Sequence, residues 1–431
     1  AHVLGRADAC AEQVALAVLG DQSTDSWSYA RLKSAVLGTG TGLLRTGLKP
    51  GDRVLMRLDN TVEFPIAYLG AIAVGLVPVP TSAQLTSPEV ARMITTLTPA
   101  AILRAHGVAC PDTDVTVIDQ PTLEAMRDLP AAPYDMGDPD RLAYIIYTSG
   151  TSGVPRAVCH AHRAIWARQM MFEGWYGLRD TDRLCHAGAF NWTYTLGTGL
   201  MDPWTIGATA LIPAPEIRPE QLPGLLAQHK ATIFASAPGV YRKLLKPDQR
   251  FDLPDLRHGL SAGEKLSHTI RTHWTKATGT EIYEAYGMSE CSTFISSSPS
   301  HPVTDDSLGR PQNGRRVAIL GADGPVPLGH EGTIAVHRDD PGLMLGYLNA
   351  PEATAEKFRG DWFVTGDQGA MDSEGQITYL GRADDMMNAG GFRVSPLEVE
   401  AALNQHPGIT QCAVTDIEVK QDARLIMAFY T

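Results

Sequence analysis

The sequence predicts an α/β protein: a large N-terminal domain of parallel-type α/β sheets plus a small β unit, followed by a small, incomplete C-terminal α+β domain. Three observations favour this class. Strand-like runs alternate with helix-like runs over most of the chain, short strands broken by Gly and Pro begin near residue 307, and a Gly-rich turn near residue 390 leads into one further helix. The 431 residues also exceed the roughly 250–300 residues that one hydrophobic core serves, so several structural units are expected.

The alternation is clear near the beginning of the chain. Residues 53–58 (RVLMRL) form a strand-like run, 61–74 an apolar helix-like run, and 76–79 a second strand-like run. A helical pattern over 89–96 and a strand over 100–103 follow. This βαβ order predicts a mostly parallel sheet covered on both faces, the class that binds ligands at the carboxyl ends of its strands.

A second α/β series follows, and a β-rich segment comes after it. Helical patterns lie at 197–205 and 219–229, and strand-like runs at 183–186, 209–212, 232–235 and 240–245. The short strands and turns of 307–336 are typical of an antiparallel unit. We therefore expect a large domain over residues 1–381, with the β unit at about 307–379.

The end of the chain predicts the start of a mobile C-terminal domain, residues 382–431. A helix is expected over 396–405 and a strand over 411–415. The chain stops directly after the apolar run 425–430, which needs something to pack against, so we expect the rest of this domain to be missing. Truncation and disorder of the missing part are both left open.

Composition disfavours several classes of function. A formal net charge of −12, with no strongly basic tract, disfavours binding to the phosphates of a long nucleic acid. The apolar stretch 67–80 is too short to span a bilayer, which needs about 20 apolar residues, so no membrane association is expected. The six cysteines stand singly with no C-x-x-C pair, which is typical of reduced thiols and predicts a cytoplasmic location.

The sharpest local signal is residues 144–158, YIIYTSGTSGVPRAV. An apolar strand runs directly into closely spaced hydroxyl and glycine residues, whose N–H and O–H donors can wrap a polyphosphate. The loop lacks the Lys of a Walker A motif, and residues 38–44 do not fit the G-x-G-x-x-G dinucleotide fingerprint. A flexible Ser/Gly linker is the alternative interpretation, which the preceding strand disfavours.

The loop resembles the phosphate loop of the adenylate-forming enzymes, which include acyl-CoA and aryl-CoA synthetases such as benzoate-CoA ligases, peptide-synthetase adenylation domains and beetle luciferase. Four more stretches resemble motifs of that family in the expected order: SAGEKL (261–266), YEAYGMSE (283–290), WFVTGDQG (362–369) and GRADDMMNAGGFRVSPLEVE (381–400). Five motifs in order leave little room for another family.

The resemblance implies an ATP site built from these motifs. The phosphate contacts would come from Thr148, Ser149, Gly150, Thr151, Ser152, Gly153 and Arg156. The adenine would be walled by Gly263, Glu264, Lys265, Glu284, Ala285 and Tyr286, with the Tyr286 ring as a stacking face. Asp367 would accept hydrogen bonds from the ribose hydroxyls, assisted by Arg382.

The resemblance also implies a catalytic set. Ser289 would contact the α-phosphate and the reacting carboxylate, Glu290 would hold Mg²⁺, and Thr148 and Arg393 would complete the set. The chemistry agrees, because a carboxylate that attacks an anionic phosphorus needs a metal and cationic or N–H donors around the nucleophile and the leaving pyrophosphate.

Two features depart from the common family pattern. The usual loop has Lys, Lys and Gly where this chain has Val154, Arg156 and Ala157, so one mobile cation is lost. Family members also carry a late Lys that bridges the carboxylate and the phosphate during adenylation. Lys420 is the last Lys here, and its surroundings do not match that motif.

The acid pocket that the resemblance implies lies around residues 190–195 and 235–240. Its lining residues would be Phe190, Asn191, Trp192, Ala237, Gly239, Gly287, Met288 and Phe294. Members that activate amino acids carry Asp where this chain has Asn191, and a neutral amide cannot offset a buried ammonium, so an α-amino acid is disfavoured. Aromatic lining suits a flat or short apolar acid, but it discriminates weakly, so aromatic and aliphatic acids both stay open.

The implied function is ATP-dependent activation of a small carboxylic acid to an acyl-adenylate, followed by transfer to CoA. Asp384 would be the hinge of the C-terminal domain, and Asn388, Gly390 and Gly391 would lie beside the pantetheine of CoA. Loading of a carrier protein is the alternative for the second step, and a non-catalytic nucleotide-binding protein is the alternative class. ATP, Mg²⁺ and CoA are the expected ligands, and a homodimer is left open.

Overall fold

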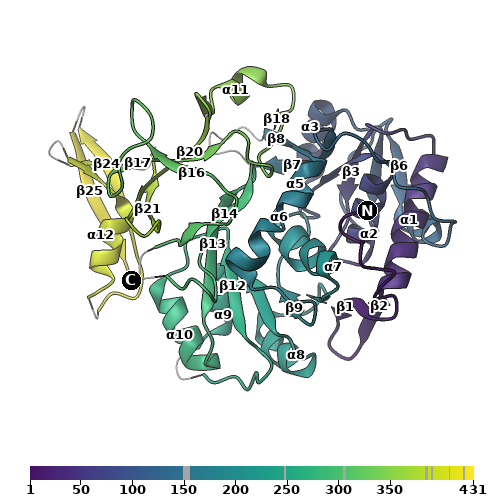
Figure 1. Ribbon diagram of the computed structural model, residues 1–431, viewed down its shortest axis with the longest axis horizontal. Helices are drawn as coiled ribbons and strands as arrows, with labels where there is room; N and C mark the ends of the chain where they lie inside the picture. Colours follow the sequence, from purple (N-terminus) through teal and green to yellow (C-terminus); the bar gives the residue numbers. More distant parts are fainter. Residues whose placement is uncertain are drawn as a thin grey trace.

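The computed structural model describes residues 1–148, 156–246, 249–303, 307–383, 387–389, 392–406, 408–420 and 423–431. For 148, 388–389, 392–393, 418–420 and 423–424 it describes the backbone alone. Figure 1 shows an N-terminal α/β region, a second α/β region, an antiparallel β unit and a C-terminal hairpin, following one another along the chain. The predicted fold class is confirmed. No helix within these ranges is long and apolar enough to cross a membrane.

The largest sheet is the central sheet of the second α/β region. Its described strands follow the order β15-β14-β13-β12-β11-β9-β10-β1-β2, and the pairing is parallel from β13 to β1. Antiparallel strands close both edges. The strands are β1 (Val14–Leu19), β2 (Thr24–Ser28), β9 (Arg183–His186), β10 (Thr209–Pro213), β11 (Ile233–Ser236), β12 (His258–Ala262), β13 (Ile282–Met288), β14 (Ser292–Ser296) and β15 (Arg310–Pro311).

Helices cover both faces of this sheet because alternate strand residues point to opposite sides. Phe234 packs with the helices α8 (Leu222–Gln228), α9 (Pro238–Leu244) and α10 (His268–Thr278), which follow the short 3₁₀ helix η3 (Pro219–Gln221). Ile233 and Ala235 pack on the other face with the π-helix η1 (Phe172–Tyr176). A second π-helix, η2 (Gly197–Met201), lies between the short helices α6 (Thr193–Leu196) and α7 (Asp202–Ile206).

One predicted strand in this region is wrong. Residues 240–245 belong largely to helix α9, which begins at Pro238. Proline at the first helical position has a backbone angle already suited to the helix and no N–H that would be left without a partner there. The apolar run of this segment therefore marks a buried helix face and not a strand.

A smaller parallel sheet forms the N-terminal region. Its order is β4 (Val77–Pro80), β3 (Arg53–Arg57), β5 (Ala101–Arg104) and β6 (Thr116–Asp119), as the βαβ pattern predicts. Its helices are α1 (Tyr29–Arg45), α2 (Glu63–Ala73), α3 (Ser87–Leu97) and α4 (Gln120–Met126). Thr86 and Glu89 form a capping box at the start of α3, which satisfies backbone donors of the first turn. Every residue of α2 is buried, so this helix lies inside the molecule.

A short antiparallel sheet joins the remaining parts. Strands β7 (Leu142–Thr148) and β8 (Arg156–Ala161) form a hairpin, to which β18 (Gly346–Tyr347) adds a third strand, and α5 (His162–Ala167) follows. The antiparallel unit contains β16 (Val317–Leu320), β17 (Glu331–His337), β19 (Phe358–Arg359), β20 (Trp362–Met371) and β21 (Ile377–Arg382), with α11 (Pro351–Ala355) beside it. The C-terminal part contains β22 (Met387–Ala389), β23 (Phe392–Val394), α12 (Pro396–Leu403) and the hairpin of β24 (Cys412–Lys420) with β25 (Ala423–Tyr430).

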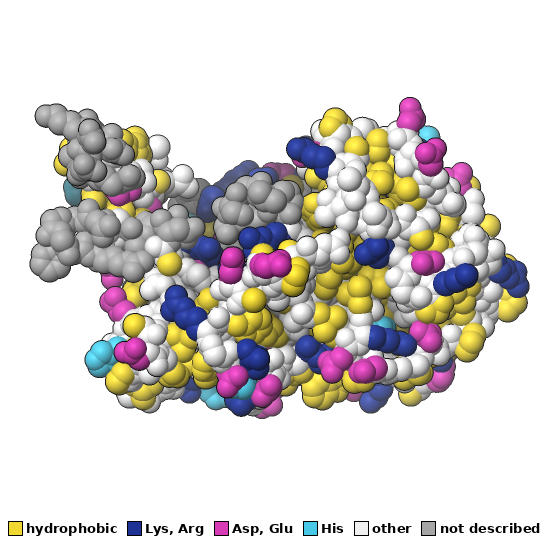
Figure 2. Space-filling model, turned by 90° about the horizontal axis from the view of Figure 1, so that it is seen from above, with side chains coloured by type: hydrophobic (Ala, Val, Ile, Leu, Met, Phe, Trp, Pro, Cys, Tyr) yellow, Lys and Arg dark blue, Asp and Glu magenta, His cyan; other side chains and the backbone are white. Residues whose placement is uncertain are grey.

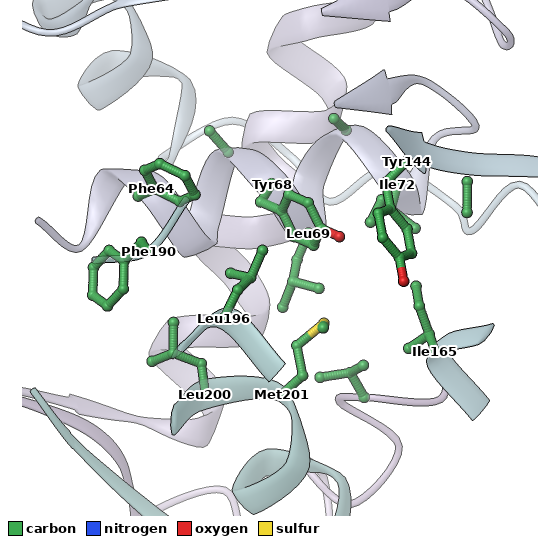
Figure 3. Packing of buried hydrophobic residues seen from close by; sticks show 14 of the residues in the cluster. Phe64, Tyr68, Leu69, Ile72, Tyr144, Ile165, Phe190, Leu196, Leu200 and Met201 are labelled. Carbon is green, nitrogen blue, oxygen red and sulfur yellow. The ribbon is translucent and has the colours of Figure 1, made fainter. Parts of the chain in front are cut away.

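The two α/β regions share one apolar core. Figure 3 shows Phe64, Tyr68, Leu69 and Ile72 of α2 facing Leu196, Leu200 and Met201 from the second region. Phe190 packs against Phe64 with ring centroids 5.6 Å apart. This shared core fixes the position of the 190–201 segment relative to the N-terminal sheet.

A buried ion pair lies beside that core. Arg168 and Asp202 are 5% and 1% exposed, and the guanidinium donates to both carboxylate oxygens at 2.8 and 2.6 Å. Tyr176 also donates to Asp202, at 2.8 Å, and Arg168 donates to the Ser292 hydroxyl at 2.9 Å. Gly197 lies so close that an added Cβ would lie 2.0 Å from the Arg168 Cζ. Elements η1, η2, α7 and β14 therefore meet around one positive charge.

We predict that Asp202→Ala destabilises the protein strongly, because it leaves the Arg168 charge buried without its partner. Loss of one member of a buried pair lowers the free energy of unfolding by roughly 3–5 kcal/mol. The matched control is Asp339→Ala, which removes an exposed ion pair with Arg316 at 2.7 Å. This control should change the free energy of unfolding by less than about 1 kcal/mol. Urea unfolding followed by tryptophan fluorescence measures both, and equal small shifts would contradict the prediction.

Candidate active site

The turn between β13 and β14 carries Ser289 and Glu290, and the short sheet holds it in place. Tyr347 of β18 donates its hydroxyl to Glu290 Oε1 at 2.7 Å, and the Met344 amide donates to the Glu290 carbonyl at 2.7 Å. Burial, and then the Glu290 charge, raise the pKa of Tyr347, so the phenol keeps the proton that it donates. Because Tyr347 pairs with Val158 of β8, the Glu290 carboxylate is tied to the β7–β8 hairpin, whose strands flank the predicted phosphate loop in the sequence.

Arg156 approaches the same group from the hairpin. Its Cζ lies 4.8 Å from the centre of the Tyr347 ring, a cation–π distance. Arg156 stands opposite Thr148 in the β7–β8 pairing, directly after the predicted phosphate loop. The structure therefore places together a cation at the end of the loop, an aromatic ring and an acidic side chain.

His160 holds the backbone of Ser289. Its Nε2 lies 2.8 Å from the Ser289 carbonyl, and its ring stacks on Tyr144 at 4.8 Å between centroids. Burial lowers the pKa of His160 to about 4, so the ring is neutral at pH 7 and Nε2 donates its proton to the carbonyl. The turn is thus fixed from β8 at Ser289 and from β18 at Glu290.

The acidic chemistry of this turn suits a magnesium ion. Mg²⁺ prefers oxygen ligands and is commonly bound by one or two carboxylates together with substrate phosphates. Glu290 offers such a carboxylate, with one oxygen already oriented by Tyr347. Across the part of the chain with described side chains, no group of three or more His, Cys, Asp or Glu residues could form a cage of its own. Glu290 therefore fits an ion shared with a nucleotide.

A second cluster lies on the same strand, toward the antiparallel unit. Tyr286 of β13 donates its hydroxyl to Asp367 Oδ2, and Arg382 pairs with Asp367 Oδ1 at 3.3 Å. Asp367 and Arg382 are directly opposite in the β20–β21 pairing. Three of the eight residues predicted to bind adenine and ribose are therefore brought together by a strand pairing and one long-range hydrogen bond.

The predicted adenine wall is only partly open to a ligand. Gly263, Glu264 and Lys265 form an exposed loop after β12, whose last residue pairs with Ala285. Gly263 has a φ of +97°, which a glycine adopts without strain. Glu284 is buried, and its carboxylate accepts from the Leu266 amide at 2.8 Å and from Arg271 at 2.6 Å. Its side chain therefore holds the start of the loop and the Arg271 side chain in place.

Burial raises the pKa of Glu284, and the Arg271 charge opposes that shift. Figure 2 shows Lys and Arg side chains, with Asp and Glu side chains beside them, near the hollowed middle of this face.

The predicted acid-binding residues divide into two groups. Phe190 and Phe294 are 1% and 0% exposed, and their rings pack in the shared apolar core. Trp192 is 50% exposed, Asn191 is half-buried, and Ala237, Gly239, Gly287 and Met288 are half-buried as well. An added Cβ on Gly287 would lie 2.1 Å from the Ser292 carbonyl oxygen, so only glycine fits that pairing.

Several predicted site residues belong to the undescribed parts of the chain or are described by their backbone alone. Ser149, Gly150, Thr151, Ser152 and Gly153 lie outside the described residues, as do Asp384, Gly390 and Gly391. Thr148, Asn388 and Arg393 are described by their backbone alone, and Asn388 pairs with Arg393 across β22 and β23. Their roles stay predictions.

Sequence reasoning missed several residues that position the site. Tyr347, His160 and Arg168 reach the Ser289–Ser292 turn from distant parts of the chain. Asn60 was also missed: it donates to the Gly188 carbonyl and accepts from the Phe190 amide, both at 2.9 Å, so it anchors the predicted acid-binding loop. The signal that could have found Arg168 is that it is the only charged residue between Arg163 and Glu173.

Comparison with known proteins agrees with this geometry. A family model described as "AMP-binding enzyme" matches residues 6–348. Benzoate–CoA ligase of Thauera aromatica is 31% identical over 416 residues, covering 91% of this chain and 78% of the relative. The 3-hydroxybenzoate–CoA ligase of Aromatoleum sp. (strain CIB) is 30% identical over 425 residues, covering 91% and 79%.

A solved structure is similar over nearly the whole chain. The anthranilate CoA ligase AuaEII in complex with anthranoyl-AMP has a TM-score of 0.88 and 25% sequence identity, and the match covers 99% of this chain and 85% of that one. The family match, the relatives at 30% identity or above and the shared fold lead to one conclusion: the chain belongs to the AMP-binding enzyme family.

Proposed function

We propose that this protein is an AMP-forming acid–thiol ligase that converts a small carboxylic acid and ATP to an acyl-adenylate and then transfers the acyl group to CoA. The observation that carries the proposal is the placement of two clusters on one strand and its turn. Tyr286 on β13 joins Asp367 and Arg382, and Glu290, four residues later, joins Tyr347 beside Arg156. One cluster suits a nucleoside and the other suits its phosphates.

In the first step, a carboxylate oxygen of the acid attacks the α-phosphorus of ATP, and the bond to pyrophosphate breaks. Arg156 offers positive charge near the phosphates, and the oriented Ser289–Glu290 turn offers a hydroxyl and a metal ligand. Mg²⁺ held by Glu290 would reduce the negative charge on the phosphate oxygens. Since such donors act best when already in place, the fixing of this turn by His160 and Tyr347 favours the reaction.

In the second step, the thiol sulfur attacks the acyl carbon, AMP leaves and the thiol proton is released to solvent. We assign the large domain to residues 1–381 and the mobile C-terminal part to residues 382–431, with Asp384 as the hinge. The Ser395 hydroxyl donates to the Leu380 carbonyl at 2.5 Å, a bond between the two parts that a rotation at Asp384 would break. A rotation there would carry Asn388, Gly390 and Gly391 toward the acyl-adenylate.

Glu290→Ala should lower acyl-adenylate formation by roughly 10²–10⁴-fold, because it removes a preorganised charge from the phosphate site. Asp367→Ala should mainly raise the KM for ATP. Acid-dependent exchange of pyrophosphate into ATP measures both. The control is Glu356→Ala, which removes an exposed carboxylate outside the site. Exchange at the wild-type rate in Glu290→Ala would refute the assigned role.

Tyr347→Phe should raise the Mg²⁺ concentration needed for exchange and lower the maximal rate by roughly 10- to 100-fold. The variant keeps the ring beneath Arg156 and removes only the hydroxyl that orients Glu290, a charge-assisted bond worth about 1.5–3 kcal/mol. Tyr347→Ala, which also removes the ring, should lower the maximal rate further. An unchanged Mg²⁺ dependence in Tyr347→Phe would show that the hydroxyl does not position Glu290.

The wild type should use benzoate-like or short unbranched acids at least about 10²-fold better than phenylalanine, because an ammonium beside the neutral Asn191 costs several kcal/mol. Asn191→Asp should raise the KM for the apolar acid, since it adds a charge. Asn313→Asp, at an exposed position, is the matched control. Comparing kcat/KM for benzoate, hexanoate, acetate and phenylalanine tests this, and a wild-type preference for phenylalanine would overturn it.

A further inference from the structure

Two fully buried polar side chains near the predicted acid-binding segment lack hydrogen-bond partners. His186 is 1% exposed and Thr195 is 0% exposed. Among the described residues, neither ring nitrogen of His186 has a partner, nor does the Thr195 hydroxyl. A buried polar group without a partner costs roughly 1–3 kcal/mol, and such groups are rare in native proteins, so each needs an explanation.

The two side chains lie beside the same residue. The position of a Cβ built on Gly188 is 2.4 Å from Thr195 Oγ1 and 3.1 Å from His186 Nδ1. A side chain on residue 188 would therefore overlap both groups. The two polar side chains therefore both lie against the Gly188 backbone.

Their place in the fold connects them to the acid. His186 is the last residue of β9 and pairs with Ala235, which begins the predicted segment 235–240. Thr195 ends the predicted segment 190–195. His186 therefore lies at the carboxyl end of a parallel strand, where α/β sheets bind ligands, and Thr195 lies in the short helix α6.

The surroundings are rigid and partly apolar. The Tyr194 ring meets His186 edge-on at 4.4 Å and stacks on Trp175 at 5.7 Å. The Tyr194 hydroxyl donates to the Leu260 carbonyl at 3.1 Å, so it is not available to His186. The π-helix η2 passes over His186, where an added Cβ on Gly199 would lie 2.7 Å from the His186 Cβ. Such π-helical turns are frequent at functional sites.

The protonation state defines the chemistry that these groups can recognise. Burial, and then the nearby Arg168 charge, lower the pKa of His186 to about 3. The neutral imidazole offers one donor and one acceptor, and the threonine hydroxyl can act as either. A hydroxyl or a neutral amino group can satisfy both, whereas a hydrocarbon surface satisfies neither.

We propose that His186 and Thr195 bind a hydroxyl or amino substituent on the carboxylic acid substrate, and so make this enzyme selective for substituted acids over the unsubstituted parent acid. The inference rests on the proposed function and names the class of acid that the same site accepts. A buried water molecule bonded to the two side chains is the competing explanation, and it predicts no such selectivity.

The test is acid-dependent pyrophosphate exchange with benzoate, its three monohydroxy isomers and 2-aminobenzoate. We expect at least one substituted acid to exceed benzoate in kcat/KM by roughly 10²-fold or more, since sites built to bond a polar substituent strongly reject analogues that lack it. Thr195→Val and His186→Phe should each reduce that ratio at least about tenfold. His258→Phe is the control, because this buried histidine begins β12 at the opposite end of the strands and should leave the ratio unchanged.

A second readout does not depend on activity. Valine matches threonine in shape and removes the hydroxyl that lacks a partner, so Thr195→Val should melt at the wild-type temperature or above it. A lower melting temperature would favour a bonded water. Two outcomes would overturn this inference but not the proposed function. One is a preference for benzoate over every substituted acid, and the other is a ratio of kcat/KM values that stays the same in Thr195→Val and His186→Phe. No exchange with any acid, despite ATP binding, would overturn the proposed function and the inference together.

Discussion

The buried charge of Arg168 is the constraint on which much of the catalytic region depends. Its guanidinium makes two bonds to Asp202 and a third to Ser292, the first residue of β14. Ser292 has a φ of +63°, which is unusual for a residue with a side chain, so a strong partner at this position helps to hold the backbone. Burial, and then the same charge, lower the pKa of His186, the last residue of β9. One ion pair thus affects both the turn that carries Glu290 and the buried polar pair near the predicted acid-binding segment.

The phosphate side and the nucleoside side are positioned by different physical means. Tyr347 and His160 hold the Ser289–Glu290 turn through hydrogen bonds from the short sheet that also carries Arg156. Asp367 is positioned by pairing within the antiparallel unit, and Tyr286 links it back to the large sheet. Because both clusters share β13 and its turn, a shift of this strand would disturb both clusters at the same time. Under the proposed function, it would weaken the binding of ATP and of Mg²⁺ together.

Local patterns in the sequence predicted most of the fold. The βαβ order of 53–103 is found as the parallel sheet of β3, β4 and β5, because each apolar run was bounded by turn residues. The run 240–245 was assigned to a strand and is part of α9, since a short apolar run does not distinguish a buried helix from a strand. The motif residues Tyr286, Asp367 and Arg382 could be chosen from the sequence because the spacing of known motifs carries that information. Tyr347 and Asn60 could not, because they reach the site only through long-range contacts.

The glycines of η2 limit the substitutions that this enzyme can accept during evolution. Gly197 and Gly199 place bare backbone directly against Arg168 and His186, and any side chain at either position would collide with them. This wall therefore cannot be reshaped by single substitutions, whereas the exposed loop at Trp192 can accept new side chains without disturbing the core. New substrate preferences should arise first on the loop side, while the π-helical wall stays the same across enzymes that differ in the acid they use.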